Sequence, residues 1–333
     1  MKAQSMHRKK ISTILVGIIF VLTACSSDGS QDAPAESGEL ELVATTTFVG
    51  DVVRQVAGPG PRITVLLEPG QNPHAYQPAP RDMIRLSEAD LVFANGFGLE
   101  EFLPDLLEGA ENTQTLVEVS QGIIPLVFEG DDQAEEDHEE GGLDDGDHPE
   151  EADDLEHLGI DPHVWFDPNN IKIWTENIAA ALAEADPGNK DFYLENASAY
   201  QSQLDELDSW IQEEVETIPV ENRKLVTDHT SFGYFAEQYG FEQIGAVVPA
   251  PTTEVETSGR QLSELVETIR EQNVKVIFVS MDIDPTMAEI VAEETGAELV
   301  LLYFGSLTED DPANSYLAFM RYNVEAIASA LSN

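Results

Sequence analysis

Short apolar runs alternate with amphipathic segments along most of this chain. In its first part, runs rich in apolar or β-branched residues predict strands at 40–46, 62–67 and 91–95, and helical spacing predicts helices at 48–56 and 81–88. Strands that alternate with helices in this way are typical of βαβ units and of a parallel sheet. The first part of the chain is therefore predicted to be an α/β unit.

The same alternation returns later in the chain, after two predicted helices at 168–185 and 191–216. The second of these helices carries apolar or aromatic residues with a period of 3.6 residues, as a long amphipathic helix does. The later predicted strands lie at 224–227, 243–248, 274–279 and 298–302, and the later predicted helices at 232–239, 258–272, 285–295 and 314–331. The predicted fold class is α/β, with two similar lobes, each a parallel sheet flanked by helices, joined by one long helix. We expect an N-terminal lobe at 40–187, a linking helix at 188–218 and a C-terminal lobe at 219–333.

The N-terminus has the form of a secretion signal. Basic residues precede an apolar run at 11–24, which is long enough for a signal peptide but short for a membrane span. The run ends at Leu22-Thr23-Ala24-Cys25, which resembles a bacterial lipobox and contains the only Cys of the chain. We expect a signal peptide at 1–24 and a flexible tether at 25–39 that starts from lipidated Cys25, although a chance Cys beside an ordinary cleavage site is the alternative. The rest of the protein is then extracytoplasmic and anchored to the membrane by lipid.

The charge is strongly negative, with 64 Asp and Glu against 16 Lys and Arg. Such a surface excludes nucleic acid and anionic substrates as partners, and a saline habitat is one explanation for it. Residues 129–157 are the extreme case, because they hold 16 acidic residues, no Lys or Arg, and His138, His148 and His157. This stretch cannot bury a core, and we expect a disordered insertion. It is either a solvated linker or an accessory, low-affinity metal collector that uses its three His.

The remaining His of the folded part each lie in a short motif. These motifs are Asn72-Pro73-His74, Asp161-Pro162-His163-Val164-Trp165 and Thr227-Asp228-His229. Scarce, dispersed imidazoles that can meet in space are typical of a transition-metal site. His74 and His229 also follow predicted strands, and ligands of parallel sheets bind beyond the C-terminal ends of strands. A capping or core role is the alternative for each His, and Asp161 and Asp228 are candidate acceptors for the second ring nitrogen.

Together these motifs resemble those of the metal-specific substrate-binding lipoproteins of ABC importers, which deliver zinc or manganese. The resemblance covers essentially the whole mature chain, and its further motifs are Ala75-Tyr76-Gln77-Pro78, Asn95-Gly96-Phe97-Gly98-Leu99-Glu100, Phe232-Gly233-Tyr234-Phe235 and Tyr239-Gly240. It implies two α/β lobes joined by a rigid helix, with the metal in the cleft between them. It also implies that His74, His163 and His229 are metal ligands and that an ABC permease is the partner.

The fourth ligand departs from the family pattern. Many members supply an Asp after the last strand, where this chain has Gly305. None of the nearby carboxylates is at the expected spacing. These carboxylates belong to Asp282, Asp284, Glu309, Asp310 and Asp311. We expect three His with water, or with a residue of the acidic insertion, as the fourth ligand. Loss of a carboxylate shifts the preference from manganese toward zinc.

The function predicted from the sequence is a monomeric, lipid-anchored zinc receptor of an ABC importer, and not an enzyme. A manganese receptor of the same family is the alternative. A metal-dependent hydrolase is disfavoured because the chain has no HExxH, no GxSxG and no phosphate loop. An adhesin is a third possibility, but no sequence feature encodes an adhesive surface.

Overall fold

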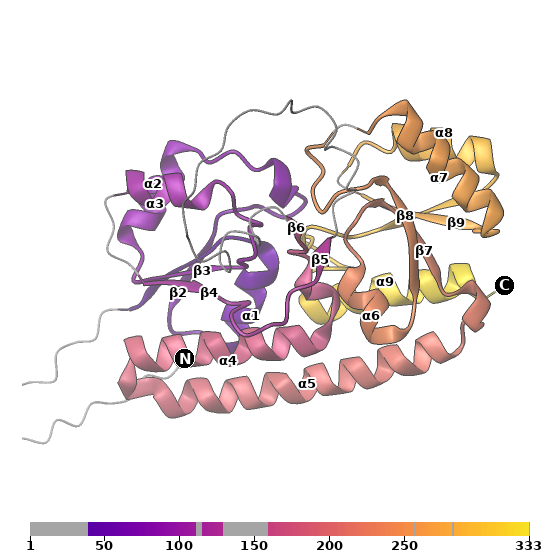
Figure 1. The fold of residues 1–333 in the computed structure, drawn as a ribbon. Coiled ribbons are helices and arrows are strands. Elements are labelled where there is room, and N and C mark those ends of the chain that lie inside the picture. Colours follow the sequence, from indigo (N-terminus) through magenta and orange to yellow (C-terminus); the bar gives the residue numbers. More distant parts are fainter. Residues whose placement is uncertain (1–38, 111–114, 129–158, 256, 282, 333) are drawn as a thin grey trace, which may run out of the picture. The chain divides into compact units, whose positions relative to one another are not determined.

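The computed structural model describes residues 39–110, 115–128, 159–255, 257–281 and 283–332. Residues Glu39–Asn333 form one compact unit (Figure 1). The predicted signal peptide, the tether up to residue 38 with Cys25, and residues 129–158 lie outside the described residues. Among the described helices, none has both the length and the apolar character needed to cross a bilayer.

The first sheet is parallel, with the strand order β2-β1-β3-β4. Its strands are β1 (Glu41–Ala44), β2 (Arg62–Val65), β3 (Leu91–Ala94) and β4 (Thr115–Glu118). The helices of this half are α1 (Thr47–Ala57), α2 (Pro80–Glu88) and α3 (Leu103–Gly109). Neither α3 nor β4 was predicted from the hydrophobic pattern, and the predicted strand at 62–67 ends two residues earlier in the structure.

The second sheet has the order β10-β9-β7-β8 and is also parallel. Its strands are β7 (Lys224–His229), β8 (Glu242–Val248), β9 (Val276–Ser280) and β10 (Glu298–Leu302). The helices here are α6 (Gly233–Tyr239), α7 (Gly259–Glu271), α8 (Thr286–Thr295) and α9 (Tyr316–Leu331). In both sheets the first strand lies between the second and the third, so the two halves share one topology and the predicted α/β fold class is confirmed.

Two antiparallel helices connect the halves. They are α4 (Pro168–Ala185) and the 27-residue α5 (Lys190–Glu216), preceded by a two-stranded pairing of β5 (Val127–Phe128) with β6 (Gly159–Ile160). Helix α5 packs against α4, against α1 of the first half and against α9 of the second, and Figure 1 shows it passing under both sheets. This is the predicted long helix. The predicted lobe boundaries at 187 and 218 remain predictions, because the described chain packs as one unit.

Local signals in the sequence set several helix ends. The side chain of Thr46, directly after β1, accepts from the amide of Val49 and starts α1. Ser258 and Gln261 form a capping box at the start of α7. Gly240 and Gly296 end α6 and α8 in the left-handed conformation, which glycine adopts without strain.

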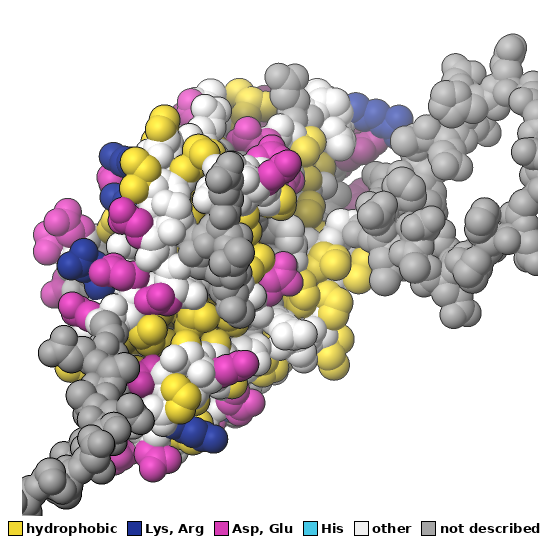
Figure 2. Space-filling model, turned by 90° about the vertical axis from the view of Figure 1, so that its left-hand side faces the viewer, with side chains coloured by type: hydrophobic (Ala, Val, Ile, Leu, Met, Phe, Trp, Pro, Cys, Tyr) yellow, Lys and Arg dark blue, Asp and Glu magenta, His cyan; other side chains and the backbone are white. Residues whose placement is uncertain are grey.

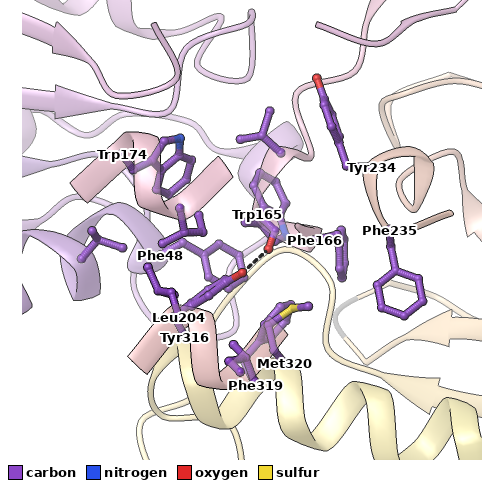
Figure 3. Close-up of a cluster of buried hydrophobic side chains, with 14 of the residues drawn as sticks. Phe48, Trp165, Phe166, Trp174, Leu204, Tyr234, Phe235, Tyr316, Phe319 and Met320 are labelled. Atoms are coloured by element: carbon purple, nitrogen blue, oxygen red, sulfur yellow. Dashed lines mark hydrogen bonds between the residues drawn. The ribbon is translucent and has the colours of Figure 1, made fainter. Parts of the chain in front are cut away.

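One apolar core continues across the two halves. Phe48 of α1 stacks on Trp165 with ring centroids 5.0 Å apart, and Phe319 of α9 meets Phe48 edge to face at 4.8 Å (Figure 3). The hydroxyl of Tyr316 donates to the carbonyl of Trp165 over 2.8 Å. Because these side chains come from both halves, the residues that follow His163 rest on a shared core.

The surface keeps the acidic character of the sequence. Figure 2 shows Asp and Glu side chains dispersed over one face among apolar and neutral groups, with few Lys or Arg. Dispersed like charge of this kind favours solubility and attracts cations.

Candidate metal centre

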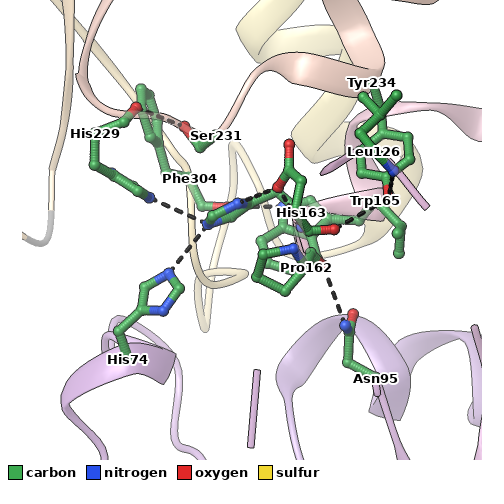
Figure 4. Close-up of polar contacts among 12 residues, drawn as sticks. His74, Asn95, Leu126, Pro162, His163, Trp165, His229, Ser231, Tyr234 and Phe304 are labelled. Carbon is green, nitrogen blue, oxygen red and sulfur yellow. Dashed lines mark hydrogen bonds and ion pairs between the residues drawn. The ribbon is translucent and has the colours of Figure 1, made fainter. Parts of the chain in front are cut away.

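Three histidines from distant parts of the chain converge at one point. His74 lies in a 3₁₀ turn (Pro73–Ala75) in the loop after β2, His163 directly precedes a second 3₁₀ turn (Val164–Phe166), and His229 is the last residue of β7. His163 and His229 are 1% and 3% exposed, and His74 is partly exposed. The structure thus brings together the three His that the sequence motifs single out (Figure 4).

The ring nitrogens are close enough to share one ion. Nε2 of His163 lies 3.0 Å from Nε2 of His74 and 3.2 Å from Nε2 of His229. Two nitrogens bound at about 2.0–2.1 Å to one tetrahedral zinc are about 3.3 Å apart. Among the described residues, these three His form the group whose possible ligand atoms all lie within 4.8 Å of one another, and no carboxylate belongs to it.

Two of the rings are oriented by carboxylates. Nδ1 of His163 lies 2.7 Å from Oδ1 of Asp161, and Nδ1 of His229 lies 2.7 Å from Oδ1 of Asp228. The same oxygens accept from the backbone amides of His163 and His229. A carboxylate that accepts from Nδ1 leaves the lone pair on Nε2, which is the atom at the meeting point.

This arrangement of lone pairs explains why the cluster suits a cation. With both Nδ1 protons donated to carboxylates, Nε2 of His163 and Nε2 of His229 face each other with lone pairs, which repel unless a proton or a metal ion lies between them. Burial lowers the pKa of His74 to about 2, helped by the other two rings, and burial also lowers the pKa of His163 well below its usual range. Protonation of His74 and His163 is therefore disfavoured, and a neutral imidazole is the form that binds a metal.

The two supporting carboxylates differ in their second oxygen. Oδ2 of Asp228 accepts from the backbone amide of Ser280 at the end of β9, over 2.6 Å. Oδ2 of Asp161 is buried and has no hydrogen-bond partner in the described structure. A Cβ at Gly233 would lie only 2.7 Å from that oxygen, so glycine allows α6 to approach it closely. Burial raises the pKa of Asp161 to about 7.

The segment before His163 has a further support that sequence reasoning missed. Nδ2 of Asn95, after β3, donates to the carbonyl of Pro162 over 3.1 Å. The buried carboxyl of Glu100 accepts from the backbone amides of Asn95 and Gly96 and from the hydroxyl of Thr45. The motif from Asn95 to Glu100 was noted in the sequence, but only the assembled loops reveal what it holds.

Among the described residues, the region of the expected fourth ligand places no carboxylate in the cluster. The ring centroid of Phe304 lies 5.7 Å from that of His229, Gly305 follows it, and Oγ of Ser306 accepts from the amide of Gly70 over 2.8 Å. The described candidates Asp284, Glu309, Asp310 and Asp311 are exposed, and Asp282 lies outside the described residues. The predicted accessory ligands His138, His148 and His157 also lie outside the described residues.

Comparison with known proteins shows that the similarity to one family of metal-binding proteins extends over nearly the whole chain. Residues 42–330 match the family model described as zinc-uptake complex component A, periplasmic (ZnuA). The manganese-binding lipoprotein MntA of Halalkalibacterium halodurans is 31% identical over 327 residues, which cover 97% of this chain and 99% of that protein. The manganese ABC transporter substrate-binding lipoprotein PsaA of Streptococcus anginosus is 32% identical over 334 residues, with coverages of 97% and 99%.

Solved structures with this fold include proteins described with either metal. The periplasmic zinc binding protein TroA from Treponema pallidum has a TM-score of 0.75 and 25% identity, and the match covers 89% of this chain and all of that one. A Mn-bound periplasmic metal binding protein from Candidatus Liberibacter asiaticus has a TM-score of 0.74 and 26% identity, with coverages of 88% and 100%.

Proposed function

Since the chain belongs to the zinc-uptake component A family of ABC-transporter substrate-binding proteins, which are receptors and not enzymes, we propose that it captures Zn²⁺ outside the cell and presents it to an importer. The metal is the cargo of the protein. It is held by His74, His163 and His229 and handed to the membrane permease of the transporter.

The chemistry of the donor set carries the choice of zinc. Three imidazole nitrogens meet without a carboxylate oxygen among the described residues of the group. Imidazole suits zinc, whereas manganese prefers carboxylate, carbonyl and water oxygens. A three-His site with an open fourth position also satisfies the usual tetrahedral coordination of zinc once water binds there.

Manganese is the second candidate. The relatives named above are described as manganese proteins, and their similarity extends over nearly the whole chain. A manganese receptor would need an oxygen ligand to join the three His. Oδ1 of Asp161 and both oxygens of Asp228 are already engaged with protein N–H groups. Oδ2 of Asp161 has no partner in the described structure, but it does not belong to the group of atoms that lie within 4.8 Å of one another.

The proposal also includes the lipid anchor, the oligomeric state and the acidic insertion. Cys25 carries the lipid that anchors the protein to the outer side of the cell membrane, as the word lipoprotein in the names of the relatives suggests. The receptor acts as a monomer, and its metal lies between the lobes proposed at 40–187 and 219–333. The acidic insertion at 129–157 collects Zn²⁺ weakly through His138, His148 and His157.

A competition titration of metal-free protein with Zn²⁺ and Mn²⁺ tests the proposal. We expect one tight Zn²⁺ site, weaker additional sites, and no displacement of zinc by an excess of Mn²⁺. Substituting His163→Ala should weaken the tight site by orders of magnitude, whereas His157→Ala should leave it intact as a matched control. Tight binding of Mn²⁺ would move the protein to the manganese alternative, and unchanged affinity in His163→Ala would refute the ligand assignment.

A further inference from the structure

His74 is held differently from the other two histidines. The rings of His163 and His229 each contact a carboxylate through Nδ1, at 2.7 Å. For His74, the described polar contacts are the Nε2 approach to His163 and a backbone hydrogen bond, in which its amide donates to Oδ1 of Asn72 over 3.0 Å, and no carboxylate is among them. The position of His74 therefore depends on the conformation of its loop.

That loop is fixed to its own half of the molecule on the side that follows His74. The hydroxyl of Tyr76 donates to Oδ2 of Asp82 over 2.9 Å, and the amide of Ala79 donates to the same oxygen over 2.8 Å. Asp82 is buried in the first turn of α2. The end of the loop is thus tied to a helix of the first half.

The side that precedes His74 is instead tied to the second half. Nδ2 of Asn72 donates to Oγ1 of Thr253, in the loop after β8, over 2.8 Å. The amide of Gly70 donates to Oγ of Ser306, after β10, over 2.8 Å. The carboxamide of Asn72 consequently joins two partners, because its oxygen holds the backbone of His74 and its nitrogen holds a hydroxyl of the opposite half.

We propose that Thr253 is a positioning residue for metal retention, which holds His74 on the bound ion through the side chain of Asn72. The proposal rests on the function proposed above and deepens it, because it assigns control of metal release to a residue that does not touch the metal. With the hydroxyl in place, departure of His74 from the ion requires the bond between the two halves to break as well. Without it, the loop before His74 loses one of its two ties to the second half.

The size of the effect follows from the chemistry of the contact. A single neutral hydrogen bond contributes a net factor of about 2 to 12 to an equilibrium. Because the bond joins loops from the two halves and holds a ligand loop that must move for the ion to leave, its loss should appear in the dissociation rate, while the association rate stays the same. A general disturbance of the fold would change both rates and the stability of the metal-free protein.

The chain offers closely matched variants for the experiment. Thr253→Val removes the hydroxyl and keeps the shape of the side chain, and Thr253→Ser restores the hydroxyl. Thr252→Val is the control from the same loop, because the bond described for Oγ1 of Thr252 is a local one, accepted from the amide of Glu254 over 3.2 Å. None of these substitutions alters a proposed ligand or a carboxylate that orients one.

The test is stopped-flow release of zinc from the loaded protein into an excess of the chromophoric chelator 4-(2-pyridylazo)resorcinol, together with the melting temperature of each metal-free variant. We expect Thr253→Val to release zinc about fivefold faster, within the 2- to 12-fold range of one hydrogen bond. Thr253→Ser and Thr252→Val should behave like the wild type, with equal melting temperatures throughout.

Equal release rates for Thr253→Val and the wild type would overturn the proposal, and so would an equal acceleration in Thr252→Val. A wild-type protein that binds neither metal would refute the proposed function first, and the positioning role with it. If the wild type binds Mn²⁺ in place of Zn²⁺, only the zinc assignment fails, and the same series is measured with Mn²⁺.

Discussion

Asp161 and Asp228 orient the two buried imidazoles in the same way, but replacing each with Asn should have unequal effects. In both cases Oδ1 accepts from the backbone amide and from Nδ1 of a histidine. The difference is the second oxygen, because Oδ2 of Asp228 also accepts from the amide of Ser280, whereas Oδ2 of Asp161 has no partner in the described structure.

An Asn side chain has one acceptor oxygen and one NH₂ group, so the outcome depends on where the NH₂ can go. At position 161 the oxygen can keep both bonds to His163, and the NH₂ replaces a buried oxygen that already has no partner in the described structure, so no existing hydrogen bond is lost. At position 228 the NH₂ must face either the amide of Ser280 or the two donors of His229. At least one hydrogen bond from a buried donor is then lost, which costs about 1–3 kcal/mol of stability.

The affinity for zinc should also fall more in Asp228→Asn than in Asp161→Asn. Loss of a residue that orients a ligating histidine typically weakens metal binding by about 10- to 100-fold. We expect Asp228→Asn to lie in this range and to lower the free energy of unfolding of the metal-free protein by about 1–3 kcal/mol. Asp161→Asn should weaken binding by about tenfold or less and leave the stability within about 1 kcal/mol of the wild type.

Zinc competition against a chelator of known affinity and urea unfolding of the metal-free variants measure the two quantities. Equal losses of affinity and stability in the two variants would refute the reasoning, because the contact between Asp228 and Ser280 would then make no difference. A larger effect of Asp161→Asn would show that the negative charge of Asp161 matters more than the hydrogen bonds counted above.

Replacing Gly233 with Ala should lower zinc affinity in the same competition assay, because the added Cβ would lie 2.7 Å from Oδ2 of Asp161. The control Gly259→Ala should leave the affinity unchanged, because Gly259, the first residue of α7, has open space around it. Gly305→Asp should raise the affinity for Mn²⁺ relative to Zn²⁺ by supplying the missing oxygen ligand, and an unchanged ratio in the competition titration would remove this loop from the site. For the metal-free protein, the folded-state pKa of His74 near 2 lies below its unfolded value of 6.5, so below pH 6.5 the unfolded state binds the extra proton. The stability of the wild type relative to His74→Gln should therefore fall by about 1.4 kcal/mol per pH unit below pH 6.5 and stay constant above it. Urea unfolding of both proteins between pH 5 and 8 measures this difference, and the opposite slope would mean that the folded ring is protonated.

The repeated fold could be predicted because hydrophobic periodicity is a local property of the chain. Runs such as Leu91–Ala94 are wholly buried, and the amphipathic repeat in Lys190–Glu216 turns one face of the helix to the core. Local capping signals such as Ser258 were also legible. The meeting of the three histidines was predictable because the motifs were few and lay mostly in loops near the ends of predicted strands.

Strand ends were less predictable, because burial and ladder pairing are different properties. The predicted strand at 62–67 included Leu66 and Leu67, which are indeed buried. Their amides still donate to the carbonyls of Ala44 and Thr45, but the regular strand ends at Val65. The edge strand Thr115–Glu118 was not predicted because its sequence, TLVE, has only two aliphatic residues, whereas the equally short Leu91–Ala94 is wholly apolar.

Hydrogen bonds between segments far apart in the chain left no mark in the sequence. The pairs Asn72–Thr253, Asn95–Pro162 and Asp228–Ser280 are separated by 181, 67 and 52 residues. Each joins a side chain to a segment whose conformation depends on the assembled fold. None of these contacts is marked in the sequence by a periodic pattern or a fixed spacing. The partners in these contacts were therefore beyond sequence reasoning, although four of the six residues lie in motifs that were singled out: Asn72, Asn95, Pro162 and Asp228.

The graded support of the three histidines suits a receptor that must both hold and release its cargo. His163 and His229 are buried, oriented by carboxylates and close to a core that spans both halves, so moving either one disturbs packing as well as hydrogen bonds. His74 is partly exposed, and its loop reaches the second half through hydrogen bonds of Asn72 and Gly70. On the proposed function, the ion is most easily released by withdrawing His74, since this costs hydrogen bonds between loops and leaves the shared core intact. A residue such as Thr253 can then adjust the lifetime of the bound metal without altering the set of ligands that selects it.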